Sequence, residues 1–191
     1  MIPGLAGGGP LFSDDCSNIT PWTDGDTGDG ASTQVTFDGE STFKLDSGTT
    51  PNDARRSRTD IVIPQQYTAT IRVYNDLVGA VAAFDNFGLQ ISNAANTIIL
   101  DARFASDGLF INDGTSNNEV GTNIVVLDEW AIFSFVVNFD AATVDVYKNG
   151  VLQGTGFALR TVGTAANRII FLQFGSATSN QISYVDWITI E

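Results

Sequence analysis

The sequence lacks histidine altogether and holds a single cysteine, Cys16, in 191 residues. Histidine is the usual catalytic base and the commonest zinc ligand, so its absence excludes Ser-His and Cys-His catalysis and histidine-based metal sites. One cysteine also excludes a disulfide within the chain. Because Cys16 stands in an apolar, strand-like stretch, we expect it to be buried and unreactive.

Positive charge is scarce as well: nine Lys and Arg stand against 22 Asp and Glu, which gives a net charge of −13. Such a surface repels phosphate groups, so we expect neither nucleic acid nor a membrane as a partner. The only basic cluster is Arg55-Arg56-Ser57-Arg58. The plain interpretation is a solvated loop beside acidic residues. The alternative is that Arg55, Arg56 and Arg58 anchor an acidic partner subunit or an anionic sugar.

No apolar run reaches the roughly 20 residues that a membrane-spanning helix needs. The first residues are rich in Gly and Pro and lack a basic segment and a long apolar core, so we expect no secretory signal peptide. We interpret residues 1–10 as a Gly-rich N-terminal arm and residues 11–191 as one domain. Since Ile2 and Leu5 give the arm two apolar side chains, we expect it to dock on a partner subunit, in an oligomer, or on its own domain.

What the sequence holds in abundance is short alternating apolar runs separated by turn residues. From Tyr67 to Val73 every second residue is apolar, as on one face of a strand. Asn149 and Gly150 suit the two positive φ angles of a type I′ turn, which predicts that residues 144–147 fold back on residues 151–157. No segment has a 3.6-residue period, and no propeller-like repeat is present. The pattern predicts an all-β fold, a two-sheet antiparallel β-sandwich of the jelly-roll type.

Three stretches carry a family signature. Residues 12–22 hold an acidic pair followed by Trp22. Residues 130–150 run from a Trp through an alternating strand and an Asp to a strand that ends in Asn-Gly. Residues 183–190, Ser-Tyr-Val-Asp-Trp-Ile-Thr-Ile, form the third stretch. Together they resemble the concanavalin A-like, laminin-G-like jelly rolls. Cys16 departs from the pattern, because those modules often carry Phe there. The resemblance implies a fold that hosts lectins, carbohydrate-binding modules, glucanases and polysaccharide lyases.

The enzymes of that superfamily make specific demands on the sequence. A retaining glucanase needs two carboxylates about 5 Å apart, which the superfamily supplies as Glu-x-Asp-x-x-Glu. None of the four glutamates has an Asp two residues later, so we expect no glucanase activity. A lyase needs a Tyr or His base and a group that neutralises a uronate. Tyr74 or Tyr147 with Arg72 or Arg103 are candidates, although tyrosines at strand spacing are typical of packing.

Two acidic features suit a hard cation such as Ca²⁺. The loop at residues 24–30 holds three Asp among glycines but lacks EF-hand spacing, and the alternative is an ordinary turn. The resemblance implies a second, structural calcium site, in which an Asp of the final strand is joined by backbone carbonyls of the first strand and of an early loop. The matching residues are Asp186, Asp14 and Gly39. The alternative is that Asp186 faces solvent on an edge strand.

Sugar binding requires exposed aromatic platforms and planar polar groups. Trp22, in a predicted loop, and the neighbours Asn86 and Phe87 are the candidates. The alternative is that these rings belong to the core, as we expect for Trp130 and Trp187.

The missing catalytic set favours a non-enzymatic structural or interaction protein. We expect a virion surface component of the decoration or tail-fibre type, made in a host cytoplasm and displayed on a phage or virus particle. The net charge of −13 would keep free subunits apart until Arg55, Arg56 and Arg58 form specific contacts. The alternative is a carbohydrate-binding module that adsorbs to cell-surface glycans. The remote alternative is a glycoside hydrolase or a polysaccharide lyase.

Overall fold

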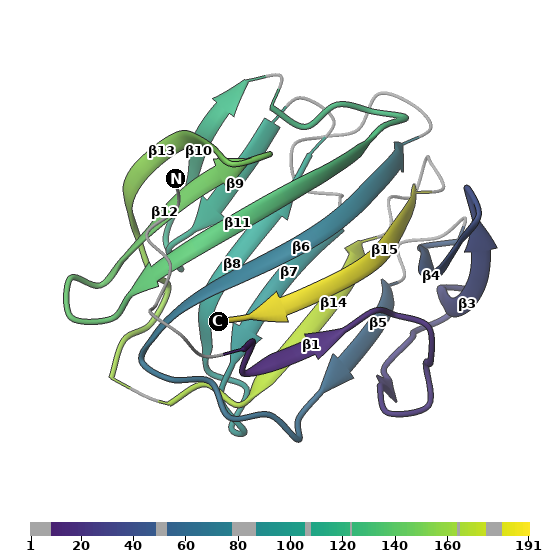
Figure 1. Ribbon diagram of the computed structural model, residues 1–191, viewed down its shortest axis with the longest axis horizontal. Coiled ribbons are helices and arrows are strands. Elements are labelled where there is room, and N and C mark those ends of the chain that lie inside the picture. The colour runs from purple at the N-terminus through teal and green to yellow at the C-terminus, as the bar shows by residue number, and fades with distance from the viewer. Residues whose placement is uncertain are drawn as a thin grey trace.

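The structure, a computed structural model, describes residues 9–48, 53–77, 87–105, 108–122, 124–163, 165–174 and 181–191 (Figure 1). These residues hold no helix that is long and apolar enough to cross a membrane. In chain order the strands are β1 (Phe12–Asp14), β2 (Thr23–Asp24), β3 (Ala31–Phe37), β4 (Glu40–Asp46), β5 (Asp53–Arg58), β6 (Gln66–Leu77), β7 (Phe87–Ser92), β8 (Ile98–Phe104), β9 (Gly108–Asn112), β10 (Asn117–Thr122), β11 (Trp130–Asn138), β12 (Thr143–Lys148), β13 (Val151–Ala158), β14 (Arg168–Phe174) and β15 (Gln181–Ile190).

Two antiparallel sheets lie face to face. The eight-stranded sheet has the order β13-β12-β11-β6-β15-β4-β3, and β1 pairs with residues of β15 beyond the segment that pairs with β4. The seven-stranded sheet has the order β10-β9-β8-β7-β14-β5-β2. The all-β, two-sheet antiparallel sandwich predicted from the alternating pattern is therefore confirmed.

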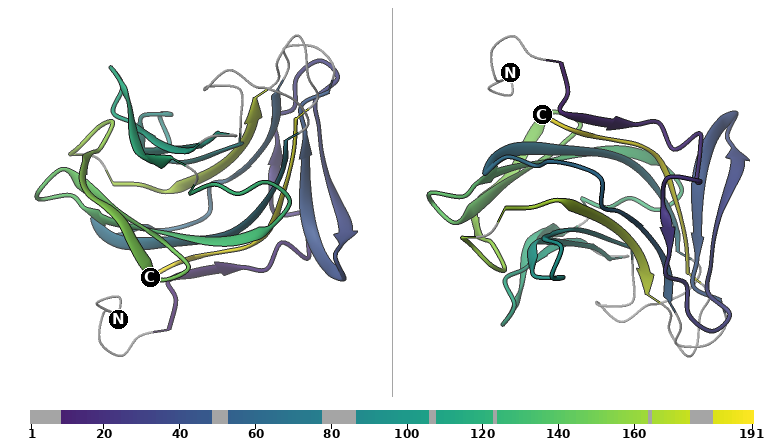
Figure 2. Two further views of the ribbon diagram at one scale, coloured as in Figure 1. Left: turned by 90° about the horizontal axis from the view of Figure 1, so that it is seen from above. Right: turned by 90° about the horizontal axis from the view of Figure 1, so that it is seen from below.

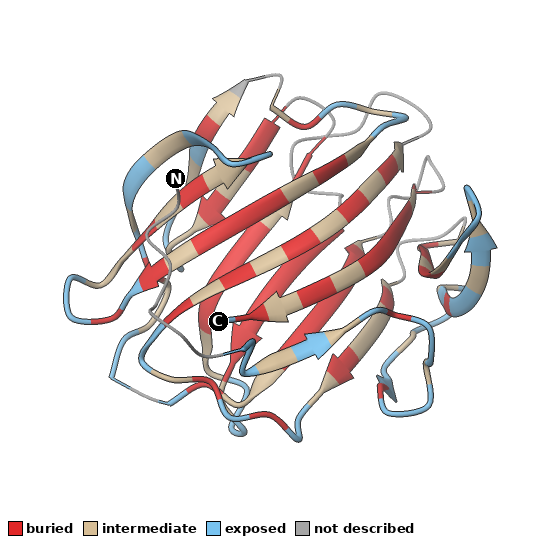
Figure 3. Ribbon diagram, viewed as in Figure 1, coloured by how far each residue is buried: buried red, intermediate tan, exposed pale blue. Residues whose placement is uncertain are grey.

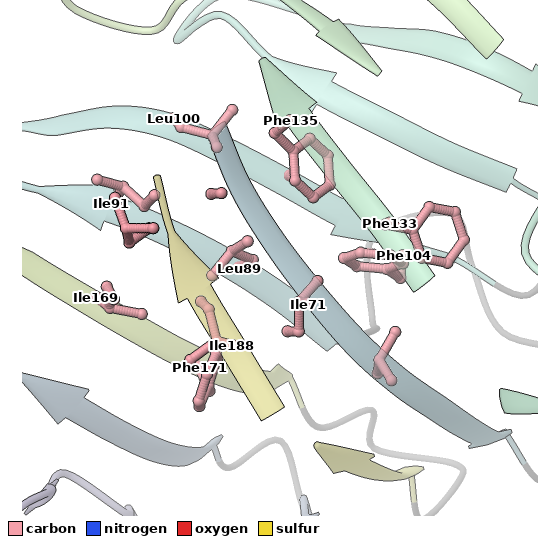
Figure 4. Close-up of a cluster of buried hydrophobic side chains, with 14 of the residues drawn as sticks. Ile71, Leu89, Ile91, Leu100, Phe104, Phe133, Phe135, Ile169, Phe171 and Ile188 are labelled. Carbon is pink, nitrogen blue, oxygen red and sulfur yellow. The ribbon is translucent and has the colours of Figure 1, made fainter. Parts of the chain in front are cut away.

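Apolar side chains from both inner faces fill the space between the sheets (Figure 4). Phe133 of β11 meets Phe104 of β8 edge to face, with ring centroids 4.9 Å apart. The predicted apolar face of β6, from Tyr67 to Val73, is buried at every second residue, and buried and half-buried residues alternate along β6 and much of β11 in Figure 3. The core is thus built from period-2 patterning, as the sequence indicates.

The β12–β13 hairpin forms as predicted. Asn149 and Gly150 have φ angles of 49° and 78°, the left-handed values that a type I′ turn requires. In the β3–β4 hairpin the two turn residues are Asp38 and Gly39, with φ angles of 52° and 84°, because Glu40 already pairs with Phe37.

Both sheets bend in the same direction (Figure 2). The outer face of the seven-stranded sheet is therefore concave, and we call it the concave face. The outer face of the eight-stranded sheet is convex, and we call it the convex face. The two faces expose different side chains, and the candidate site follows from that difference.

Candidate functional site

Polar side chains cross the concave face in a line. In β8, Leu100, Ala102 and Phe104 belong to the core, so Asp101 and Arg103 between them point outward. Strand register places Gln90 of β7 opposite Asp101, and the line continues on both sides. We call this line, across β10, β9, β8, β7, β14 and β5, the polar row: Asn117, Asn112, Asp101, Gln90, Ile170 and Ser57.

Asp101 is the centre of the polar row. Its side chain is 0% exposed and accepts hydrogen bonds from two arginines. Arg103 binds it with two nitrogens, Nε to Oδ1 at 2.8 Å and Nη2 to Oδ2 at 2.9 Å. Arg160 Nη1 donates to Oδ2 at 2.6 Å, and Gln90 Nε2 donates to Oδ1 at 3.1 Å. A buried carboxylate needs such partners, and here it fixes two guanidinium groups that are themselves 19% and 32% exposed.

Arg160 reaches the site from the segment after β13. Its backbone N–H donates to the Ile99 carbonyl at 2.9 Å, which ties this segment to the start of β8. The side chain also donates to Asn112 Oδ1 at 3.3 Å. Gly114 makes room for it, because a Cβ at Gly114 would lie 3.3 Å from Arg160 Cγ and the φ of +93° already favours glycine.

Aromatic rings lie beside the arginines. The Arg103 guanidinium is over the Phe174 ring, 4.6 Å from its centroid. Phe110 of β9 is the cross-strand partner of Arg103 and half-buried on the same face. Gly88, the other cross-strand partner of Arg103, has no side chain, so the Phe174 ring can lie across it. The concave face therefore combines planar polar groups with apolar ring surface.

Two further arginines share the concave face. Arg168 donates to Ser57 Oγ at 3.2 Å and to the Asn96 side chain, and Arg55 is the cross-strand partner of Leu172. Burial, and then the positive charge of Arg55, lower the pKa of Arg168 from its ordinary value. Within the part of the chain that the structure describes, neither guanidinium forms an ion pair with a carboxylate. The concave face thus gathers four of the nine Lys and Arg of the protein, together with the carboxylates of Asp101 and Glu119.

The structure brings together only part of the set considered for a lyase. Arg72 and Tyr74 lie on the same outer face of β6 and both contact Trp130, whereas Arg103 is in the other sheet. Tyr147 is on β12 of the eight-stranded sheet. Tyr67 is in the core, where burial raises its pKa. The described part of the concave face therefore holds two positive groups beside a carboxylate but no tyrosine.

The aromatic platforms predicted for sugar binding are wrong at the two positions that the structure describes. Trp22 is 3% exposed, stacked on Phe171 at 4.8 Å and edge to face with Phe43. Phe87 is 0% exposed and packs in the core. A ring whose faces are covered cannot stack on a sugar. Asn86 lies outside the described residues.

The core assignment of the other two tryptophans is also wrong. Trp130 and Trp187 are half-buried on the convex face. Trp130 follows the alternation of β11, in which its neighbour Ala131 faces the core. In β15 a β-bulge shifts the register between Val185 and Trp187, so both Val185 and Ile188 face inward and Trp187 faces outward.

Asp186, the one carboxylate predicted to bind calcium, and Asp14, predicted to contribute a backbone carbonyl, both have arginine partners. Asp186 pairs with Arg72. Asp14 Oδ2 accepts from Trp22 Nε1 at 3.0 Å and from Arg58 at 3.2 Å. Gly39 is in the exposed β3–β4 turn. In the described ranges no three Cys, Asp or Glu side chains gather as a metal site requires.

The acidic loop at residues 24–30 forms structural hydrogen bonds. Asp26 accepts from the Ser32 N–H at 2.7 Å, from the Ser32 hydroxyl at 2.6 Å and from the Arg55 N–H at 2.6 Å. It therefore joins β3, at the edge of the eight-stranded sheet, to β5 of the seven-stranded sheet, as a turn residue with a backbone role would. Cys16 nearby is buried as predicted, and burial followed by the charge of Asp14 raises the pKa of its thiol.

The basic cluster is the strand β5 and not a loop. Arg56 donates to the Ser32 carbonyl at 2.6 Å and pairs with Asp24 at 3.5 Å. Arg58 pairs with Asp14 and Asp60. Both are engaged within the chain, so only Arg55 keeps a guanidinium without an ion pair in the described structure. Ile2 and Leu5, predicted to contact a partner, lie outside the described residues.

Sequence reasoning missed most of the concave cluster. Asp101, Arg160, Gln90 and Asn112 were not expected to act together, and Arg103 was considered only as a charge for a lyase. One signal was available: Asp101 and Arg103 alternate with apolar residues, which places both on one face of a strand. Nothing local indicates Arg160, because a loop residue joins the cluster only through tertiary structure.

No family model matches the sequence, and no curated protein matches it. Solved structures do resemble the fold. A sialidase aligns at a TM-score of 0.74 and 10% identity over 95% of this chain, which spans only 18% of that sialidase. The endo-β-1,4-glucuronan lyase of the fungus Trichoderma reesei aligns at 0.71 and 10% identity over 95% of both chains. A carbohydrate esterase of the Shiga toxin-encoding bacteriophage phi24B aligns at 0.63 and 15% identity, over 95% of this chain and 97% of that one.

A lectin domain bears on the ion prediction. The exoplasmic/lumenal domain of VIP36, in a form bound to Ca²⁺ and Man3GlcNAc, aligns at a TM-score of 0.61 and 6% identity over 91% of this chain and 84% of that one. At such identities the likeness concerns the fold alone. These neighbours confirm the predicted resemblance: the chain has the concanavalin A-like jelly-roll fold.

Proposed function

We propose that this chain is a non-catalytic glycan-binding domain, and that its concave face binds sugars that carry carboxylates. The observation that carries the proposal is the pair Arg103 and Arg160, fixed on the buried Asp101 in a protein of net charge −13. Because Asp101 is fully covered, a ligand in the concavity meets the remaining N–H groups of the guanidiniums. A planar fork of such donors suits a uronate or sialate carboxylate.

The neighbours of the two arginines support a sugar as the ligand. Asn112 and Asn117 of the polar row are half-exposed and carry amide groups, which can donate to and accept from hydroxyls. Phe110 offers apolar surface beside them, and Arg55 and Arg168 add positive charge to the same face. Planar polar groups next to aromatic rings are typical of carbohydrate sites. The fold likeness to a glucuronan lyase and to lectins is consistent with such a ligand.

The lack of a histidine, tyrosine or lysine base on the described part of this face supports binding without turnover, although Glu119, the cross-strand partner of Phe110, is an exposed carboxylate there. Elimination or hydrolysis needs a group that takes or gives a proton at the reacting sugar. The chain has no histidine, and both carboxylate oxygens of Asp101 are already hydrogen-bonded. In the ranges that the structure covers, the concave face offers no tyrosine or lysine in its place.

Binding to uronate polymers tests the proposal. Glucuronan and polygalacturonate should bind at low salt in titration calorimetry, and dextran should not bind to this face. Added salt should weaken the binding, since partly exposed ion pairs are screened. Arg103→Gln should weaken it about tenfold or more, because the forked donor is lost.

The convex face supplies a matched control. Arg72 also pairs with an Asp and lies 4.5 Å from an aromatic centroid, that of Trp130. Arg72→Gln should therefore leave uronate affinity unchanged. Equal affinities of wild type and Arg103→Gln would contradict the concave site, and release of unsaturated or reducing ends from the polymers would contradict the non-catalytic assignment.

We further propose that the domain is displayed on a phage or virus particle, in an oligomeric assembly. Two observations support this: the nearly full-length fold likeness to a phage protein and the apolar residues of the N-terminal arm. Light scattering of the full chain should give an oligomer, and deletion of residues 1–10 should reduce it to smaller species. A wild-type chain that is monomeric at high concentration would contradict the display proposal and leave the glycan site unaffected.

A further inference from the structure

A groove lies on the convex face, on the opposite side of the molecule from the polar row. Its volume is about 670 Å³, within the ~300–1,000 Å³ typical of ligand sites. Its floor is formed by Ile132 and Ser134 of β11 and Thr70 of β6. The β12–β13 turn forms one wall, because the Asn149 N–H donates to the Ile132 carbonyl at 2.8 Å and so folds the turn onto β11. Trp187 lines the groove from β15.

Trp187 differs from the other two tryptophans. Trp22 is stacked in the core. Trp130 contacts the rings of Phe37 and Tyr74, and it also contacts Arg72 and Asp38. Trp187 is half-exposed and has neither a ring contact nor a hydrogen bond from its indole N–H within the described ranges. Its cross-strand partner Arg72 is over the Trp130 ring instead. The β-bulge of β15 therefore presents an indole to the groove with no protein partner.

The polar groups around Trp187 are hydroxyls, an amide and the carboxylate of Glu191. The Thr70 hydroxyl donates to the Ser134 hydroxyl at 3.0 Å, and Thr189 is the cross-strand partner of Thr70. Asn149 uses Oδ1 to accept from the Ile132 N–H at 3.0 Å, which leaves its NH₂ group for a ligand. Of the described residues, no arginine or lysine lines the groove. With the Glu191 carboxylate and no cation among its lining residues, the groove suits a ligand that has many hydroxyls and no negative charge.

We propose that this groove is a second glycan site, selective for neutral hexose units. An indole face takes the C–H face of a pyranose, while hydroxyl and amide groups take its hydroxyls. The site is independent of the proposed uronate site, because the two lie on opposite outer faces of the sandwich (Figure 2). One domain would then hold two different glycans at once, and a particle with several copies would gain avidity from both.

Titration with neutral oligosaccharides tests the second site. Cellohexaose, laminarihexaose and mannohexaose serve as probes, and the full chain is followed by its tryptophan fluorescence and by calorimetry. At least one probe should bind with an indole signal, and Trp187→Ala should weaken it about tenfold or more. Trp187→Phe should retain part of the affinity because it keeps a ring. Thr189→Ala, which leaves the indole in place, should weaken binding by a smaller factor.

Two controls keep the sites distinct. Arg103→Gln should leave neutral-sugar affinity unchanged, and Trp187→Ala should leave uronate affinity unchanged. Urea midpoints of all variants show whether each is folded. Equal neutral-sugar affinity in wild type and folded Trp187→Ala, or no binding of any probe to wild type, would overturn the second site and leave the concave site untouched. If the wild-type chain binds a neutral probe but no uronate polymer, only the proposed uronate site on the concave face is overturned.

Discussion

The two outer faces of the sandwich contain the same elementary unit in different surroundings. On the concave face Arg103 lies 4.6 Å from a Phe174 centroid and pairs with Asp101; on the convex face Arg72 lies 4.5 Å from a Trp130 centroid and pairs with Asp186. The concave unit gains a second arginine and two amides, whereas the convex unit is surrounded by rings. The comparison teaches that an arginine–aspartate pair beside an aromatic ring can be a purely structural feature of a sheet surface. Additional hydrogen-bond donors around such a pair, as on the concave face, are what indicate a ligand site.

The rings on the convex face contact one another. Phe37 stacks on Tyr184 at 3.8 Å, and Tyr74 meets Trp130 edge to face at 5.5 Å. Asp38 of the β3–β4 turn accepts from Trp130 Nε1 at 3.2 Å. The cluster thus holds the β3–β4 hairpin against β6 and β11 of the same sheet, and Trp187 is left as the indole that has no such role.

The largest effect should come from a tryptophan that belongs to neither face. Trp22→Ala removes a ring that is stacked on Phe171 and leaves a cavity, which should lower the free energy of unfolding by about 3–5 kcal/mol. Trp187→Ala, on the convex face, should cost less than about 1 kcal/mol. Urea denaturation of both variants measures the difference. Equal losses would mean that Trp187 is structural and would weaken its assignment to a ligand site.

The next largest difference should be between substitutions of Asp101 and Asp186, in the free energy of unfolding. Asp101→Asn leaves two arginines facing each other around a buried amide, and we expect a loss of about 2–3 kcal/mol after allowance for their partial exposure. Asp186→Asn disturbs one pair near the surface and should cost about 1 kcal/mol. Thermal or urea unfolding at constant salt gives both values. A larger loss for Asp186 would reverse the comparison of the faces.

Tyr67 offers a smaller effect with a defined pH dependence. Its hydroxyl is buried and has no hydrogen-bond partner among the described residues, so Tyr67→Phe should raise the free energy of unfolding at pH 7 by about 1 kcal/mol. Burial raises the pKa of Tyr67 above its usual value near 10, so the native state keeps a proton that the unfolded chain loses. Stability should be intact below pH ~10 and fall as the pH rises further.

Urea midpoints of wild type and Tyr67→Phe between neutral pH and pH ~11 test that slope. The advantage of the phenylalanine variant should widen as the pH rises. A gap that stays constant would show that Tyr67 ionises as readily in the native state as in the unfolded one.

The smallest effect should come from calcium. Because Asp186, the predicted carboxylate ligand, has an arginine partner, we expect the thermal midpoint to be the same with excess Ca²⁺ and with EDTA. A clear rise of the thermal midpoint with Ca²⁺ would mean that Asp186 exchanges Arg72 for the ion and would restore the calcium site that the sequence resemblance implies.

The fold could be predicted from the sequence because alternation is local. The face of β6 from Tyr67 and the Asn149-Gly150 turn depend on a few consecutive residues, and both were predicted correctly. Trp187 shows where local reasoning fails. In a regular strand it would share the inward face of Val185, and only the bulge at Asp186 turns it outward.

The concave cluster could not be predicted from the sequence for a different reason. Gln90, Asp101 and Asn112 come from three strands and meet only because the register aligns them. Trp22 has the converse problem: it follows a proline in a predicted loop, and its burial depends on Phe43 and Phe171 far along the chain. Long-range pairing decides both cases, and no short window of residues contains it.

The way the polar row is assembled governs how such a protein can change over generations. Most of its members sit inside strands, so connecting segments can lengthen or shorten without moving them. A single residue inserted within β8, by contrast, would turn Asp101 and Arg103 toward the core and push Leu100 or Ala102 into the open. Insertions and deletions should therefore accumulate in the loops at the ends of the strands. Ligand preference should change by substitution at fixed positions on the concave face.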